Sequence, residues 1–478
     1  MATIADSVGE MREDIPLKQG TKSARWCSCD EDVFGGSRFV NISFGVLSVV
    51  VTIALLVQIN YGDYQVAPHG SVASDSSECS SIGTTILKNG GNAVDAAIAS
   101  TFCLAVVNPH ITGLDASGQM LLYDHRTREK PITIDFSNIK SEMGLFPRLT
   151  IAFAYVHKKY GKLSWKTLVQ PSADLARSGF LVSRTLASSL LNYQGPNNIF
   201  GGTLEAGKKL TLKPLGDYLS IIGNTAEEDL YKHVSNTNEL LESLAAVSKF
   251  KNYNIFVPAT SEIGSTLMSN LQQLDHFNFS ASELLKPSYV STIAQVTKNG
   301  YDNLNTMGQY YEGTSSNVAV MDLNDFYVSI VTGMSAPFGS GKVTVGGYLS
   351  DINYTAKLSH LPLIITDTNY VCGRRIVLGF GDIVIGSQVI TSLLLSAENL
   401  TISVEGPRFH ILRNGALGIE KGHTPSYSTD VINNLENLTN GMVEQIKEPY
   451  SSCNVVEKYG DALNSHSDSR GGGIASRF

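Results

Sequence analysis

An uncharged apolar run near the N-terminus limits the architecture of this 478-residue chain more than any other stretch does. From Phe39 to Ile59 the sequence reads FVNISFGVLSVVVTIALLVQI, with no charged residue and only scattered Asn, Ser, Thr and Gln. About 20 such residues in a helix match the thickness of the hydrocarbon core of a bilayer. The run therefore predicts one transmembrane helix over residues 39–59.

The charges around this run predict its orientation. Basic residues precede it closely, and the next lysine or arginine after it is distant: Lys18, Lys22, Arg25 and Arg38 come before, and Lys88 after. Because basic residues stay on the cytosolic side, residues 1–38 are predicted to be a disordered cytosolic tail. The run starts late and lacks a small-residue cleavage signal, so an uncleaved anchor is favoured over a signal peptide. We expect a single-pass type II protein of the plasma membrane or secretory pathway.

Glycosylation sequons agree with this orientation. All of the predicted sites follow the apolar run, namely Asn278, Asn353, Asn399 and Asn437. Asn-x-Ser/Thr is the acceptor pattern for N-linked glycans, which are added on the lumenal side.

Two of the six cysteines lie in the predicted tail, and the other four lie where disulfides are permitted: Cys79, Cys103, Cys372 and Cys453. Cys103 sits inside an apolar helical pattern. We therefore expect it to be buried and unpaired.

Composition excludes several classes of function. A net charge of −8 offers no basic field, so no nucleic-acid partner is expected. The chain lacks a P-loop, a dinucleotide fingerprint and an HExxH zinc motif. It also shows no cluster of metal ligands, and neither a metal nor an organic cofactor is expected.

Helical and strand patterns alternate along the chain. An Ala-rich helix is predicted between the cap Asn92 and the breaker Pro109. The alternation around a charged turn predicts a hairpin from Met120–Tyr123 and Ile132–Phe136. Residues 141–250 look mainly helical.

The second half is richer in strands. A second hairpin is predicted from Asn317 onward around the turn pair Asn324-Asp325. Two strands over 363–366 and 375–378 and a helix over 387–397 follow. Together these patterns predict an α+β or layered α/β fold.

Several motifs resemble one enzyme family. The string GGNAVDAAIASTFCLAVVNPHITGLDASGQMLLYD, residues 90–124, is similar to the opening signature of the gamma-glutamyltransferases, also called glutathione hydrolases. The family pattern recurs in YYEGTSSNVAVMD (310–322), SAPFGSG (335–341) and SDSRGGG (467–473). The resemblance implies an N-terminal-nucleophile hydrolase, an αββα sandwich, here preceded by the membrane helix.

Family membership also implies self-cleavage into a heterodimer at the bond Gly313–Thr314. Residues 60–313 would form the large-subunit-like region and residues 314–478 the small one. Cleavage frees the α-amine of Thr314, whose pKa of about 8 lets it act as the base for its own hydroxyl. Thr314 would then attack γ-glutamyl amides such as glutathione.

The resemblance also assigns substrate-binding positions, through an alignment that needs gaps. The family's substrate-binding residues fall at or near Ser335, Asp351, Asn353, Ser359, His360, Ile385 and Gly386.

The chain departs from the family pattern in places. Ser137 replaces the arginine that clamps the substrate α-carboxylate, Gly333 replaces a threonine, and Ile385 replaces one of the twin oxyanion glycines. Losing the clamp should cost about 2–4 kcal/mol of binding.

Two functional hypotheses remain open. The first is a γ-glutamyl hydrolase or transferase. The second is a membrane-tethered pseudoenzyme that binds or regulates partners. The short ectodomain would also suit a splice form or an incomplete gene sequence.

Overall fold

The computed structural model describes residues 32–61, 68–140, 146–195, 199–234, 239–303, 315–352, 360–396, 399–412, 414–439 and 441–478. The chain divides into two compact units, residues 1–66 and residues 67–478. We call the second the large unit and describe each unit by itself.

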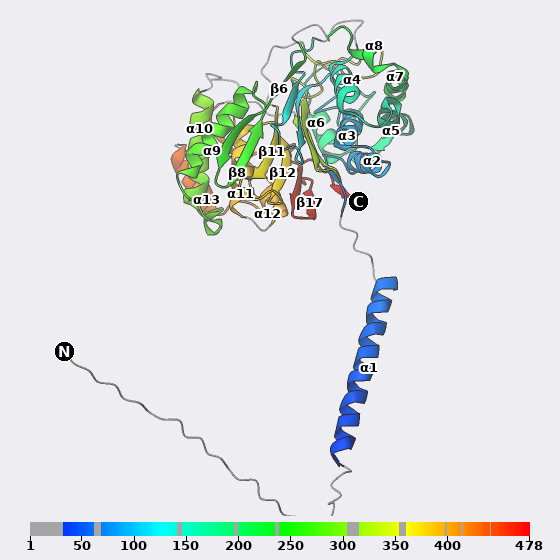
Figure 1. Cartoon of the computed structure of the whole chain (residues 1–478). Helices are drawn as coiled ribbons and strands as arrows, with labels where there is room; N and C mark the ends of the chain where they lie inside the picture. Colours follow the sequence, from blue (N-terminus) through cyan, green and yellow to red (C-terminus); the bar gives the residue numbers. More distant parts are fainter. Residues whose placement is uncertain are drawn as a thin grey trace, which may run out of the picture. The chain divides into compact units, whose positions relative to one another are not determined.

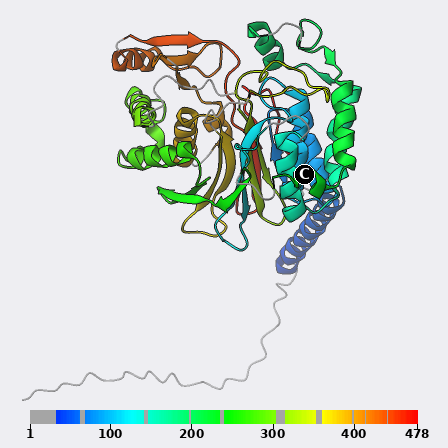
Figure 2. The same ribbon diagram turned by 90° about the horizontal axis from the view of Figure 1, so that it is seen from above.

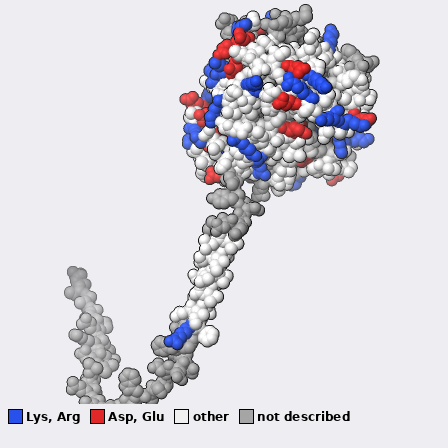
Figure 3. Space-filling view, turned by 90° about the vertical axis from the view of Figure 1, so that its right-hand side faces the viewer, with Lys and Arg blue, Asp and Glu red and all other residues white. Residues whose placement is uncertain are grey.

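The first unit contains one long helix, α1 (Asp32–Tyr61). Its stretch Arg38–Gln58 has a mean hydropathy of 2.4, and no part of it is buried against other residues of the protein. Helix α1 is therefore long and apolar enough to cross a membrane. Figure 3 shows a white, uncharged surface along most of this helix and a blue basic side chain near one end. The helix begins inside the tail predicted for residues 1–38, and residues 1–31 of that tail lie outside the described residues.

The large unit is built on two antiparallel sheets (Figure 1). The first sheet has, in spatial order, strands β18 (Ser476–Arg477), β1 (Ser71–Ala73), β9 (Ser315–Met321), β10 (Phe326–Gly333), β2 (Ser117–Asp124), β3 (Ile132–Asp135) and β6 (Leu241–Leu244). The second has β17 (Ala462–His466), β16 (Val455–Tyr459), β12 (Arg375–Phe380), β11 (Leu361–Asp367), β8 (Tyr253–Val257) and β7 (Ala246–Phe250).

Helices cover the outer face of each sheet. Those on the seven-stranded sheet are α2 (Ser77–Lys88), α3 (Ala93–Val107), α4 (Arg148–Tyr160), α5 (Trp165–Ser178), α6 (Arg184–Asn192), α7 (Lys213–Asn224) and α8 (Glu227–Tyr231). Those on the six-stranded sheet are α9 (Glu262–Asp275), α10 (Pro287–Asn303), α11 (Ile383–Leu395), α12 (Leu400–Glu405) and α13 (Thr429–Leu438). Smaller elements are η1 (Ala281–Glu283), the pair β4 (Phe180–Leu181) and β5 (Lys209–Leu210), and the sheet of β13 (Phe409–Ile411), β14 (Leu417–Glu420) and β15 (Val443–Ile446).

The sequence alternation of the strands explains the layers. In β9, Val318 and Val320 belong to the core shared with the helices, whereas Ala319 and Met321 belong to the core between the two sheets. Successive side chains of a strand point to opposite faces, so a strand that is apolar at every position must be covered on both. The layer order is helix, sheet, sheet, helix, as the view from above shows (Figure 2). The α+β prediction is confirmed.

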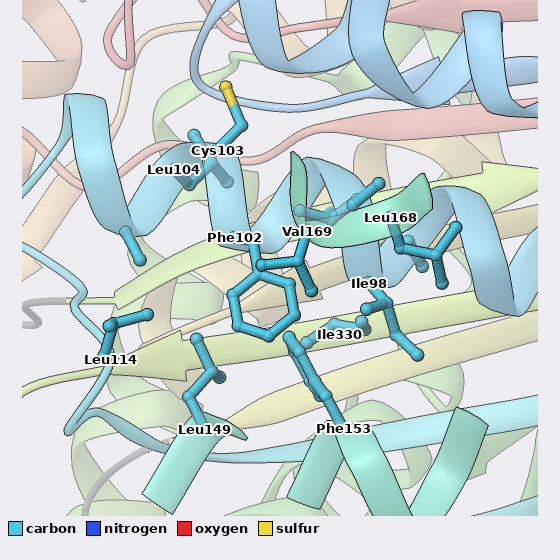
Figure 4. Close-up of a cluster of buried hydrophobic side chains, with 14 of the residues drawn as sticks. Ile98, Phe102, Cys103, Leu104, Leu114, Leu149, Phe153, Leu168, Val169 and Ile330 are labelled. Atoms are coloured by element: carbon cyan, nitrogen blue, oxygen red, sulfur yellow. The ribbon is translucent and has the colours of Figure 1, made fainter. Parts of the chain in front are cut away.

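Helix α3 lies in the hydrophobic core between the seven-stranded sheet and its helices. Asn92 Oδ1 accepts from the amide of Asp95 (3.0 Å), and the Asp95 carboxylate accepts from the amide of Asn92 (3.2 Å), which is a capping box. Every residue of α3 is buried. Phe102 packs edge-to-face against Phe153 of α4, and both lie in the cluster of Figure 4.

The expectation that Cys103 is unpaired is wrong. Cys103 forms a disulfide with Cys79 of α2, and their Cα atoms are 5.3 Å apart. In Figure 4 the Cys103 sulfur points away from Phe102. A helix that is apolar on all sides can bury a cysteine and still present it to a neighbouring helix, so burial did not imply a free thiol. Cys453 is buried and Cys372 exposed, and both are free.

Candidate functional site

Three central strands of the seven-stranded sheet have termini that lie side by side, and we call this end of the strands the edge of the site. Ser315, the first residue of β9, pairs with Gly333 at the end of β10, and Gly333 pairs with Ser117 at the start of β2. The predicted cleavage residues Gly313 and Thr314 immediately precede β9 and lie outside the described residues. Asn353 and Ser359, which the sequence also singled out, lie outside the described residues as well.

A buried ion-pair network lies at this edge, and Arg148 is its centre. Its Nε lies 3.3 Å from Asp115 Oδ1, and its Nη2 lies 3.0 Å from Asp351 Oδ2. Ser335 donates to both Asp351 oxygens, through its amide and its hydroxyl, at 2.9 Å each. Burial raises the pKa of Asp351, and the Arg148 cation and the Ser335 hydrogen bonds oppose this rise.

A third carboxylate, Asp135, ends strand β3. Gln119 Nε2 donates to its Oδ2 at 2.7 Å, and the hydroxyl of Thr260 donates to the same oxygen at 2.8 Å. The amide of Ser137 donates to Oδ1 at 3.0 Å. Ser137, the predicted replacement of a clamp arginine, is therefore held against the end of the first hairpin.

His360 connects the two groups of carboxylates electrostatically. It is 2% exposed, and burial lowers its pKa to about 4, with the charge of Asp135 opposing this and that of Arg148 adding to it. Its Nδ1 and the Oε1 of Gln119 are buried atoms without a hydrogen-bond partner among the described residues. Unpaired buried polar atoms are rare in folded proteins, and an unfilled binding site is one reason for them. We call Asp115, Asp135, Arg148, Asp351 and His360 the acidic cluster.

A second polar network holds the first residues of β9. Ser316 donates to the Asp75 carboxylate, and Asn454 Nδ2 donates to the other oxygen of Asp75 at 2.7 Å. Asn317 and Asn454 exchange side-chain to main-chain hydrogen bonds at 2.8 Å. These contacts fix the strand that leads directly to residue 314.

The start of α11 lies beside His360 on the other sheet, because Leu361 pairs with Phe380 at the end of β12. Asp382 caps the helix by accepting from the amide of Val384 at 2.9 Å. The amide of Gly386 donates to the carbonyl of Asp382 at 3.0 Å, inside the first turn. This amide is thus used by the helix, and a substrate-binding role for Gly386 stays a prediction.

The motif SDSRGGG has a structural role in the described residues. Asp468 pairs with Arg408 at 2.7 Å, and Arg470 pairs with Glu420 at 2.7 Å. Asp468 also accepts from the amide of Cys453 at 3.0 Å. This network ties the C-terminal segment to the core beneath β16.

Sequence reasoning singled out some of the cluster and missed the rest. The structure brings the predicted residues Ser335, Asp351 and His360 together around Arg148. The sequence had not indicated Arg148 as a site residue. Arg148 stands directly after Pro147, outside the motifs that carry the family resemblance. The described part of the chain contains no group of three or more His, Cys, Asp or Glu side chains placed to hold a metal ion.

Comparisons with known proteins identify relatives. A family model described as gamma-glutamyltranspeptidase matches residues 79–142 and 147–247. Glutathione hydrolase 7 of Bos taurus is 25% identical over 530 residues, which cover 84% of this chain and 78% of that protein. The human glutathione hydrolase 7 is 26% identical with the same coverage.

A solved structure shares the fold. The crystal structure of a cephalosporin acylase from Bacillus halodurans has a TM-score of 0.67 at 17% identity and covers 86% of this chain and 96% of its own. These sequence matches confirm the resemblance seen in the motifs: the chain is similar to the gamma-glutamyltransferases, also called glutathione hydrolases.

Proposed function

We propose that the large unit is an acyl-transfer enzyme that hydrolyses or transfers γ-glutamyl groups of glutathione and related peptides. Thr314 is its nucleophile. The observation that carries the proposal is the position of the acidic cluster beside the first residue of β9. Ser315, which follows Thr314 in the chain, pairs with Gly333, and Ser335 two residues further on donates to Asp351 of the cluster.

The nucleophile is made by cleavage of the chain. The Thr314 hydroxyl attacks the carbonyl carbon of Gly313, and the amide bond becomes an ester as the nitrogen takes up a proton. Water hydrolyses this ester and leaves the carboxylate of Gly313 and the free α-amine of Thr314. That amine then serves as the base that activates the hydroxyl for the acyl donor. The products would be the two chains of a heterodimer, residues 1–313 and 314–478.

The cluster favours a particular kind of donor. It combines three carboxylates with one guanidinium and a neutral imidazole. An ammonium group of the donor would complement this excess of negative charge, whereas an α-carboxylate has no free cation of the cluster to meet it. We therefore infer that the donor amine contributes more to binding than its carboxylate does.

A second candidate is a pseudoenzyme that keeps the fold without turnover. Two observations favour it: among the described residues Ser137 makes its hydrogen bonds within its own hairpin, and Asp351 is already paired with Arg148. In this case the large unit would serve as a binding or regulatory domain.

We also propose that α1 anchors the protein in the plasma membrane or a membrane of the secretory pathway, with the large unit outside or in the lumen. Its length and hydropathy, the basic residues before it and the sequons after it support this orientation. Of these sequons, Asn278, Asn399 and Asn437 are exposed in the structure.

The test is a denaturing gel of the full-length protein after glycan removal, beside Thr314→Ala and Thr314→Ser. We expect two fragments from the wild type and from Thr314→Ser, which keeps a hydroxyl, and one band from Thr314→Ala. Turnover of a γ-glutamyl anilide by the cut protein then separates the enzyme from the pseudoenzyme. An uncut wild type would refute the enzyme proposal, since the active N-terminus would never form.

A further inference from the structure

A pocket of about 930 Å³ opens far from the acidic cluster, where β11 ends and β12 begins. Its walls come from the β11–β12 connection, the start of α12, and strands β16 and β17. His360 precedes the other end of β11, so the two places are separated by about 20 Å of strand. This volume lies at the upper end of the range of about 300–1,000 Å³ that ligand sites occupy.

A glycosylation sequon forms part of the pocket wall. Asn399, Leu400 and Thr401 all line it. The side-chain Oδ1 of Asn399 accepts from the amides of Thr401 (3.0 Å) and Ile402 (3.4 Å), and so caps α12. Because Oδ1 faces the helix, the Nδ2 atom on the other side of the amide group is directed away from it. Nδ2 is the atom that carries an N-linked glycan, so capping and glycosylation are compatible.

The lining suits a sugar. Two tyrosine rings at the pocket stay unusually exposed, Tyr370 at 72% and Tyr459 at 64%, and each offers an apolar face with a polar tip. Asn464 and Asp367 add an amide group and a carboxylate group to the lining. The hydroxyl oxygen of Ser465, also in the lining, is buried and has no partner among the described residues. A pyranose ring has apolar C–H faces and hydroxyls at its edge, which match this combination.

We propose that the N-linked oligosaccharide on Asn399 folds back into this pocket and fills it, so that its first sugar rings become part of the structure. The inference rests on the proposed lumenal position of the large unit, which glycosylation requires. The glycan would cover the exposed tyrosines, and it would also shield Cys372, whose exposed side chain lines the same pocket.

The first test is the release of glycans by peptide N-glycosidase from the native, full-length protein in detergent, with each site followed by mass spectrometry. Asn437 is the internal control, because it is exposed on α13 and is not among the residues that line this pocket. We expect release at Asn399 to be at least about tenfold slower than at Asn437, which corresponds to about 1.4 kcal/mol of contacts that oppose release. After denaturation the two rates should be equal.

The second test uses a matched pair of variants. Thr401→Ala destroys the sequon but keeps the Asn399 cap, and Thr401→Ser keeps both. Cys372 should react with a maleimide several-fold faster in Thr401→Ala than in Thr401→Ser. Thr401→Ala should also lower the melting temperature by about 2 °C, whereas Asn437→Gln, which removes another glycan, should not.

The outcomes separate this inference from the proposed orientation. If neither Asn399 nor Asn437 carries a glycan, both the orientation and the inference fail. If Asn437 is modified but Asn399 is unmodified, or is released as fast as Asn437, only the inference fails. Equal maleimide rates in the two Thr401 variants would also overturn it.

Discussion

The imidazole of His360 shows how one residue can couple the acidic cluster to pH. Burial holds its folded-state pKa at about 4, against 6.5 for an unperturbed histidine. Between these values the unfolded chain binds a proton that the folded protein does not. The free energy of unfolding must therefore fall as the pH is lowered from about 6.5 to 4, by about 3 kcal/mol for this one group. Above pH 6.5 the histidine is neutral in both states and the effect disappears.

Replacing His360 by glutamine should flatten this dependence. We expect the wild type to lose about 2 kcal/mol more stability than His360→Gln between pH 7 and pH 5. Urea unfolding at the two pH values measures the difference. His276→Gln, at an exposed position, is the control and should behave like the wild type. His110 is also buried with a lowered pKa, so some acid sensitivity should remain in every variant. An equal loss in the wild type and His360→Gln would contradict the prediction.

At the residue scale, sequence motifs could indicate Ser335, Asp351 and His360 but not Arg148. A motif records which residues stand at particular positions of a family, and Arg148 lies outside these motifs. Its partner Asp351 is 203 residues away along the chain, and only the fold brings the two within 3.0 Å. An arginine at a helix start otherwise resembles a solvated charge. The roles of Gly313 and Thr314 stay predictions.

At the scale of elements, alternation predicted the two hairpins well. The predicted pairs Met120–Tyr123 with Ile132–Phe136, and the strands around Asn324-Asp325, correspond to β2–β3 and β9–β10. Asp325 has a φ of 58°, as a turn residue of this kind often does. Residues 141–250 were only partly helical, because β6 and β7 follow α8. Short strands with half-exposed faces contain few apolar residues. Their sequence therefore gave no clear strand pattern, and the region was predicted to be helical.

The α2–α3 pair carries a prediction at this scale. The disulfide Cys79–Cys103 closes a loop with a sequence separation of 24 residues. Removing such a crosslink frees the unfolded chain and should lower the free energy of unfolding by about 3 kcal/mol. Cys79→Ala, Cys103→Ala and the double variant should all lose about the same amount, because each removes the same bond. Urea unfolding measures this, with the wild type in reducing agent as a fourth case. A double variant that loses the sum of the two singles would show that packing, and not the crosslink, dominates.

At the scale of the whole large unit, the strand order interleaves the two predicted subunits, because each sheet contains strands from both. Strands β9 and β10, after residue 314, lie between β1 and β2, which precede it. In the other sheet, β11 pairs with β8. Each of these seams is a ladder of main-chain hydrogen bonds flanked by buried side chains. Neither fragment could keep a complete sheet alone.

A cut at Gly313–Thr314 should therefore leave one particle. We expect the two fragments to elute together in size-exclusion chromatography in detergent, at the same volume as uncut Thr314→Ala, and to unfold in one transition. On a denaturing gel they should separate even without reducing agent, because the disulfide of the described residues lies within the first fragment. Separation of the fragments under native conditions would contradict the interleaved sheets. Joint elution combined with a single unfolding transition would mean that cleavage changes the chemistry at Thr314 and leaves the cooperative core of both sheets intact.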